Sequence, residues 1–189
     1  MVLEERGKIM EALECIKTRR SCRKFQEEAV PHEVLEEIVG VAAFAPSWKN
    51  TQIARYIVVE DKAKLQAIAS DCVLGFEYNM KTISRCPALV VVTMVKNRSG
   101  YEKDGSYTTS KEDRWEMFDA GIATQTFSLA AHEKGLGTVI MGIFDEAKIA
   151  EVVDIPEGQQ VAALVAIGYP VFQPEAPKRK EVAELLSFQ

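Results

Sequence analysis

The segment Ala88–Val95 restricts the possible folds of this sequence more than any other. It is a continuous apolar run that is broken only by Thr93 and that contains three consecutive valines. β-branched residues favour strands, and a strand without alternating polar positions is buried on both of its faces. Segments 55–60 and 161–167 have the same character. The sequence therefore predicts a sheet in one domain, residues 1–189, with helices packed against both faces.

Apolar residues at helical spacing and helix-end signals place the helices around these strands. The longest predicted helix, 112–134, has a centre rich in small and apolar residues, which is typical of a buried helix, and is followed by Gly135, a natural C-terminal cap. A further extended segment follows at 138–141. The polar segment 96–110, which contains two glycines, is interpreted as a mobile surface loop. The other predicted helices cover residues 8–18, 31–45, 62–70 and 145–153.

Composition argues against several classes of protein. A chain of 189 residues is long enough for one domain with a core and too short for two of ordinary size. Its net charge of −5 argues against general nucleic-acid binding, which requires a positive surface. No apolar run is long enough to span a membrane, and the N-terminus lacks the layout of a signal peptide. The chain is therefore expected to be cytoplasmic, without nucleic-acid or membrane partners.

The cysteines and histidines predict no metal site. The four cysteines form no CxxC pair and no Cys/His cluster at zinc spacing. Reduced thiols in a cytosolic protein are the favoured interpretation. His32 follows a proline at a predicted helix start, and His132 lies near the end of a predicted helix, where a cation interacts favourably with the helix dipole. Both positions have structural explanations, so neither histidine is assigned a catalytic role.

Two clusters of basic residues are candidate anion sites. The first occupies six residues around Ser21. Guanidinium groups bind phosphate oxygens through paired hydrogen bonds, and a serine hydroxyl adds a donor. The alternative is a solvated basic turn, since charge runs usually face water. The two clusters could meet around one phosphate, although sequence spacing does not show that they do. The first contains Arg19, Arg20, Arg23 and Lys24, and the second contains Lys178, Arg179 and Lys180.

A third candidate site, residues 45–52, carries hydrogen-bonding side chains directly after the helix-breaking Pro46. Ser47 and Asn50 are among the groups that could bind the polar edge of a heteroaromatic ring. Trp48 could stack on such a ring, although a tryptophan more often serves in packing. Loops are often polar, so this segment alone does not predict a ligand.

Taken together and in order, these segments resemble the nitroreductase family of flavoproteins. Residues 19–25 resemble the family's RRSxRxF signature, and residues 45–52 resemble its second motif. Residues 120–125, followed by 135–138 and Gly142, resemble the central helix and the turn beside the flavin. The closing Lys178-Arg179-Lys180 resembles the family's basic tail. The resemblance extends over nearly the whole chain.

The resemblance implies an α+β fold with a central mixed or antiparallel sheet covered by helices. It also implies an intertwined homodimer that holds tightly bound FMN at the subunit interface. The first motif and the basic tail should bind the phosphate and ribityl chain, the second motif should reach the flavin of the other subunit, and a turn backbone should lie along the ring. The residues implied are Arg19, Arg20, Ser21, Arg23, Pro46, Ser47, Asn50, Asn79, Ile140, Met141, Gly142, Lys178, Arg179 and Lys180.

The sequence departs from the family pattern at four positions. Trp48 and Lys49 stand where the second motif is often small and polar, and Ile53 stands where proline is common. Thr82 stands where some members have lysine. These departures affect the expected substrate pocket more than FMN binding. Cys22 lies inside the phosphate motif, where a packing role is favoured over a reactive thiolate.

The activity that the resemblance implies is a ping-pong transfer of hydride from NAD(P)H through FMN to a nitroaromatic, a quinone or a free flavin. Because the cofactor carries out this chemistry, no catalytic residue is named. A specialised role in reductive dehalogenation or flavin breakdown is one alternative. A non-enzymatic flavin carrier or redox sensor is another. The motifs do not separate these, nor NADH from NADPH, and the 96–110 loop is a candidate lid over the acceptor.

Overall fold

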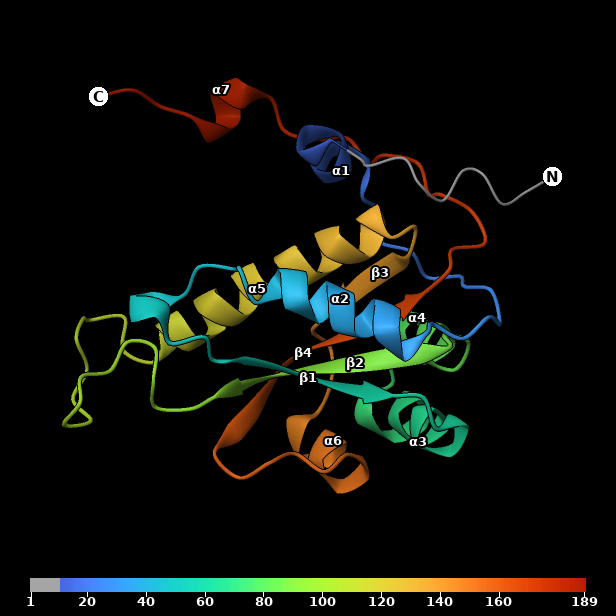
Figure 1. Cartoon of the computed structure of the whole chain (residues 1–189), viewed down its shortest axis with the longest axis horizontal. Coiled ribbons are helices and arrows are strands. Elements are labelled where there is room, and N and C mark those ends of the chain that lie inside the picture. Colours follow the sequence, from blue (N-terminus) through green and yellow to red (C-terminus); the bar gives the residue numbers. More distant parts are fainter. Residues whose placement is uncertain (1–10) are drawn as a thin grey trace.

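The computed structural model describes residues 11–189, so the first residues of the helix predicted at 8–18 lie outside the described part of the chain. Within this part, helices and strands alternate along the chain (Figure 1). The elements are α1 (Ala12–Thr18), α2 (His32–Ala42), η1 (Trp48–Asn50), β1 (Ala54–Val59), α3 (Lys62–Ala67), η2 (Ile68–Cys72), α4 (Glu77–Ile83), β2 (Ala88–Val95), α5 (Arg114–Glu133), β3 (Gly137–Met141), α6 (Glu146–Val152), β4 (Gln159–Gly168) and α7 (Val182–Leu185).

The four strands form one sheet in the order β1-β2-β4-β3, and every neighbouring pair is antiparallel. β2 lies inside the sheet, and its residues Ala88–Met94 are at most 2% exposed. Side chains alternate across the strand: Val90 contributes to the core beneath α2 and α5, whereas Leu89 contributes to the core beneath α3, α4 and α6. Burying each such side chain stabilises the fold by about 1.5–3 kcal/mol. The predicted α+β fold, with helices on both faces of the sheet, is confirmed (Figure 1).

The prediction that segment 55–60 forms a fully buried strand is wrong. β1 lies at an edge of the sheet, so β2 is its only strand neighbour among residues 11–189. Arg55 is exposed, and Val58 is 37% exposed. Apolar composition does not distinguish a central strand from an edge strand that another surface can cover. β1 therefore leaves an apolar edge open in the described chain.

Helix α5 crosses one face of the sheet beside α2 (Figure 1). It ends where predicted, because Gly135 adopts a left-handed conformation with φ 77° that favours glycine. One side of α5 is buried around Phe127, but Met117 and Phe118 on the other side are 50% and 58% exposed. Phe44, directly after α2, is 89% exposed. Unlike the buried helix that its composition suggests, α5 therefore presents an apolar surface that the described chain does not cover.

Most residues of the 96–110 segment are exposed, as expected of a surface loop. Ser99 and Gly100 at its base are buried, and the prediction of a solvent-facing loop is wrong there. Tyr101 and Tyr107 form an antiparallel bridge that closes the tip. Glu102 at the tip forms an ion pair of 2.9 Å with Lys49. The loop is thus attached to the segment that precedes β1.

The chain ends in an arm that leaves the body of the molecule. Beyond Pro170, nearly every residue is exposed, and the arm passes α1 before it reaches α7 and the C-terminus (Figure 1). Val182, Leu185 and Phe188 on the arm are 70%, 70% and 90% exposed. No helix within residues 11–189 combines the length and apolar character needed to cross a bilayer.

Candidate functional site

The basic segment 19–23 lies against the outer edge of β3. Helix α1 leads into it and packs on the C-terminal half of α5, where the Thr18 hydroxyl and His132 Nε2 are 2.9 Å apart. The Cys22 amide donates a hydrogen bond of 2.9 Å to the Thr138 carbonyl, and Ser21 pairs with Thr138 in a parallel bridge. The segment is therefore placed by backbone hydrogen bonds to the sheet.

Close packing against Gly137 of β3 also fixes the basic segment 19–23. A Cβ atom on Gly137 would lie 2.7 Å from Cys22 Cβ and 2.8 Å from Cys22 Sγ, so this contact requires glycine. Cys22 is 5% exposed, and its burial raises the pKa of the thiol even though Arg19 and Arg23 act to lower it. The structure thus supports the packing role expected for Cys22 and does not favour a reactive thiolate.

The three arginines of the segment have different surroundings. Arg20 Nη1 donates to the carbonyls of Lys17, at 2.7 Å, and Arg19, at 2.8 Å, so this guanidinium caps the end of α1. Its Nε atom is buried without a partner among residues 11–189. The guanidinium groups of Arg19 and Arg23 form no hydrogen bond or ion pair with any residue in that range. Burial, followed by the charges of Arg19 and Arg20, lowers the pKa of His132. The segment is thus a positive site without a counter-charge in the described chain.

Further along the β3 edge lie four more residues expected beside the flavin: Asn79, Ile140, Met141 and Gly142. Asn79 in α4 is 6% exposed, and its Nδ2 donates a 3.1 Å hydrogen bond to the Ile143 carbonyl, so it joins α4 to the end of β3. Ile140 is 44% exposed, whereas Met141 is buried. A Cβ atom on Gly142 would meet no atom within 4 Å, so a ligand can approach the backbone there. The β3 edge brings these residues into line with the basic segment.

The second motif lies at the opposite edge of the sheet. Pro46, Ser47 and Asn50 directly precede β1, and Lys49 and Asn50 both have positive φ angles, 44° and 56°. Strand pairing aligns Thr138 of β3 with Ala88 of β2, through Ile167. It aligns Ala54, the first residue of β1, with Met94, six positions further along β2. With strands about 4.8 Å apart and about 3.4 Å per residue, the separation is roughly 14 Å across and 20 Å along the sheet.

One chain therefore does not bring the two motifs together. The basic tail also stays apart: all three of its residues are exposed, and the contacts of Arg179 and Lys180 lie within the tail. Arg179 Nη1 donates to the Pro177 carbonyl, and Lys180 Nζ lies 4.0 Å from Glu184. No hydrogen bond or ion pair in the described chain joins Lys178 to the basic segment at residues 19–23. The expected meeting of the two basic clusters thus stays a prediction.

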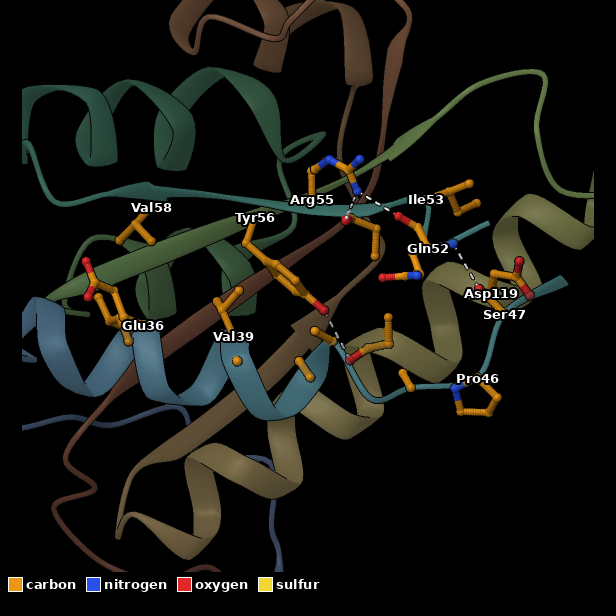
Figure 2. Close-up of a pocket in the computed structure, with 17 residues that line it drawn as sticks. Glu36, Val39, Pro46, Ser47, Gln52, Ile53, Arg55, Tyr56, Val58 and Asp119 are labelled. Atoms are coloured by element: carbon orange, nitrogen blue, oxygen red, sulfur yellow. Dashed lines mark hydrogen bonds between the residues drawn. The ribbon is translucent and has the colours of Figure 1, made fainter. Parts of the chain in front are cut away.

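A groove of about 650 Å³ runs between α2 and β1 and ends at the second motif. Figure 2 shows Tyr56 in the middle of this groove, facing Val39, with Pro46 and Ser47 at one end. The Tyr56 hydroxyl donates to the Ala123 carbonyl at 3.4 Å, and burial raises its pKa to about 12. The walls are mainly apolar, so the groove fits an apolar partner better than a charged one.

Sequence reasoning did not identify Asp119, which borders the groove and accepts a 2.9 Å hydrogen bond from the Trp48 amide. The available signal was an acidic residue inside a predominantly apolar stretch of the predicted long helix. No group of three or more possible metal ligands occurs within residues 11–189. All four cysteines are free thiols, as predicted.

Comparisons with known proteins show the family of this chain. The model of the nitroreductase family matches residues 16–169. A Methanothermobacter thermautotrophicus protein with the provisional name NADH dehydrogenase/NAD(P)H nitroreductase is 32% identical over 174 residues, which cover 89% of this chain and 83% of that protein. An iodotyrosine deiodinase from Nematostella vectensis is 24% identical over 97% of this chain and 76% of its own length. The solved FMN-dependent nitroreductase from Clostridium difficile is 28% identical, with a TM-score of 0.69 over 87% of this chain and 90% of that chain.

The β3 edge fits FMN. The guanidinium groups of Arg19 and Arg23, which have no partner among residues 11–189, could bind a phosphate, the Ser21 hydroxyl could add a donor, and the open backbone at Gly142 leaves room for a ring. The family match covers most of the chain, and the solved relative has the same fold and depends on FMN. The chain therefore belongs to the nitroreductase family of FMN-dependent oxidoreductases.

Proposed function

We propose that this protein transfers hydride from NAD(P)H to a small electron acceptor by a ping-pong mechanism, and that the acceptor is a nitroaromatic, a quinone or a free flavin. The observation that carries the proposal is the pair of uncommitted guanidinium groups, Arg19 and Arg23, beside the open β3 edge. Bound FMN would accept the hydride and pass the electrons on. The chain's own residues bind, orient and shield that cofactor.

The roles of these residues follow from their surroundings. Arg19, Ser21 and Arg23 would bind the FMN phosphate, since charge-assisted hydrogen bonds to phosphate are among the strongest in proteins. Arg20 would act indirectly, because its Nη1 already caps α1 and so fixes the start of the segment. Positive charge near the cofactor stabilises negative charge that develops during reduction. The backbone at residues 140–142 and the Asn79 side chain would orient the ring, and Lys178, Arg179 and Lys180 would close on the phosphate.

A homodimer would complete the site. The two flavin motifs lie at opposite edges of one sheet, so a second copy is needed to bring Pro46, Ser47 and Asn50 to a flavin held at the β3 edge. The described chain also leaves suitable surfaces uncovered: Met117 and Phe118 on α5, the apolar groove beside β1, and the C-terminal arm. Exposed apolar surface of this extent marks an interface in proteins that remain in solution.

The test is the visible spectrum of the purified protein, followed by addition of NADH or NADPH without oxygen. Flavin bands that bleach support the proposal and identify the preferred donor. Bands that persist with both nucleotides contradict it and favour a flavin carrier or sensor. The reduced protein is then mixed with 1,4-benzoquinone, nitrofurazone or FMN, and the rate at which the bands return ranks the acceptors.

A second candidate function is reductive dehalogenation, which is favoured by the likeness to an iodotyrosine deiodinase over 97% of this chain. The same apparatus distinguishes the two. If 3-iodotyrosine reoxidises the reduced protein faster than the quinone does and tyrosine appears as the product, dehalogenation is the activity. If iodotyrosine leaves the bands bleached, the general reductase assignment stands.

A further inference from the structure

One buried carboxylate connects both ends of the turn in the second motif. Asp119 is 4% exposed, and its Oδ2 atom accepts the Trp48 amide at 2.9 Å and the Ser99 hydroxyl at 2.5 Å. The hydroxyls of Ser99 and Thr51 are 2.7 Å apart. Because Ser99 donates its single proton to Asp119, Thr51 must donate to Ser99. The η1 turn is thus held at Trp48 directly and at Thr51 through one intervening hydroxyl.

The turn adopts a conformation that the backbone does not favour. Lys49, Asn50 and Gln52 have φ angles of 44°, 56° and 49°, in the left-handed region that suits glycine. Such residues persist where their surroundings fix them, and two buried groups contact this turn: the Asp119 carboxylate at Trp48 and the Ser99 hydroxyl at Thr51. No lysine or arginine within residues 11–189 forms an ion pair with Asp119. A buried carboxylate without a cation is costly, and hydrogen-bond donors from the turn and the loop offset that cost.

We propose that Asp119, acting through Trp48 and Ser99, is a positioning residue that sets the affinity of the protein for FMN. This inference rests on the proposed function, in which the turn's Ser47 and Asn50 contact the flavin of the other subunit. Asp119 holds the turn in the shape that presents these two side chains. The loop that contains Ser99 belongs to the same unit, since Lys49 also pairs with Glu102 across it.

Asp119→Asn tests whether the position of the hydrogen-bond acceptor or its negative charge holds the turn. Both donors converge on one oxygen, Oδ2, and an amide carbonyl oxygen can also accept two hydrogen bonds. Asp119→Asn should therefore retain FMN binding within about threefold, whereas Asp119→Ala should weaken it by about tenfold or more, the factor expected for hydrogen bonds to a charged group. Ser99→Ala should weaken it to an intermediate degree, and the double variant should be no worse than Asp119→Ala alone.

The chain offers a matched control. Glu116 lies one turn earlier on α5, is also 4% exposed, and accepts a 3.1 Å hydrogen bond from the Arg98 amide, not from the η1 turn. Glu116→Gln should leave FMN affinity unchanged within about twofold. Trp48 and Trp115 are the only tryptophans, and their rings are 4.8 Å apart, so the emission of the FMN-free protein reports the position of the turn. That emission should change in Asp119→Ala and be restored in Asp119→Asn.

The experiment is a fluorescence titration of each FMN-free protein with FMN, with thermal unfolding measured in parallel. Weak binding by Asp119→Ala, with recovery in Asp119→Asn and wild-type affinity in Glu116→Gln, supports the inference. If Asp119→Ala binds FMN as tightly as the wild type, the inference fails while the proposed function stands. If the wild type itself binds no FMN, both fail. If Asp119→Ala does not fold, Ser99→Ala decides: wild-type affinity in that variant overturns the inference.

Discussion

Cys22 packs directly against Gly137, so closely that a single added carbon on Gly137 would lie 2.7 Å from Cys22 Cβ. This contact seats the basic segment on the first residue of β3. The neighbouring hydrogen bond from the Cys22 amide to Thr138 fixes its register on that strand. The geometry of the proposed phosphate site therefore depends on Gly137, although this residue has no side chain that could contact the phosphate.

Gly137→Ala should consequently impair FMN binding by displacing the segment. Overpacking of a closed contact costs about 1–3 kcal/mol. We expect the melting temperature, measured by calorimetry, to fall by several degrees. We expect the affinity for FMN, measured by fluorescence titration, to fall by a larger fraction. Wild-type affinity in this variant would show that the segment's position does not control phosphate binding.

Removing both uncommitted guanidinium groups should release FMN and leave the fold intact. Each charge-assisted hydrogen bond contributes about 1.5–3 kcal/mol, so Arg19→Ala with Arg23→Ala should lower affinity by more than a hundredfold. Lys24→Gln is the matched control. It also removes a positive charge from the first basic cluster, but the Lys24 ammonium group lies 5.8 Å from the centre of the Phe172 ring. A double variant that purifies with full flavin and an unchanged circular dichroism spectrum would contradict the assignment.

A charge on the exposed side of α5 should disrupt the proposed dimer. Phe118 is 58% exposed, so Phe118→Asp should not disturb the core of the single chain. We expect light scattering to give the mass of a monomer and absorbance to show loss of FMN. A monomeric variant that retains stoichiometric FMN would refute the shared site.

His132 and His32 should make the stability of the fold depend on pH in opposite directions. Burial, Arg19 and Arg20 lower the pKa of His132, so the unfolded chain binds its proton more readily than the folded chain. The contribution of neutral His132 to stability is therefore complete above about pH 6.5 and is lost as the pH falls through the lowered pKa. His132→Gln should flatten this acid loss of stability in thermal unfolding of the FMN-free protein.

His32 provides the contrast. Its hydrogen bond of 2.7 Å to Glu60 raises its pKa, so its contribution is complete below about pH 6.5 and is lost as the pH rises through the raised value. The group is exposed, so the effect should be small. If His132→Gln and His32→Gln shift the pH profile of the melting temperature in the same direction, the account of His132 is wrong.

Local patterns predicted the core of this fold well and its edges poorly. The apolar run at residues 88–95 does form a buried central strand, and Gly135 does end the long helix. The burial of β1 was wrongly predicted because its apolar character is that of an edge strand beside an open groove. Helix α4 was missed because it follows Phe76, which supplies no capping side chain, whereas the short helices α3 and α6 follow the capping residues Asp61 and Asp145.

The candidate site shows the same division. Residues 19–23 could be proposed as an anion site from the sequence because their basic and hydroxyl side chains are contiguous. The role of Asp119 could not, because its partner Ser99 lies 20 residues away and its partner Trp48 lies 71 residues away. Nor does sequence spacing reveal that the two flavin motifs lie at opposite edges of one sheet, since this depends on the order of the strands.

The shared site is tested most directly by mixing two defective chains. One carries Arg19→Ala with Arg23→Ala, and the other carries Ser47→Ala with Asn50→Ala. Each alone should bind FMN poorly. After the two are unfolded and refolded together, every mixed dimer should contain one intact site, and tight FMN binding should return in proportion to the mixed dimers. If the mixture binds no more FMN than the separate variants, the flavin site is not shared between subunits and the account is contradicted.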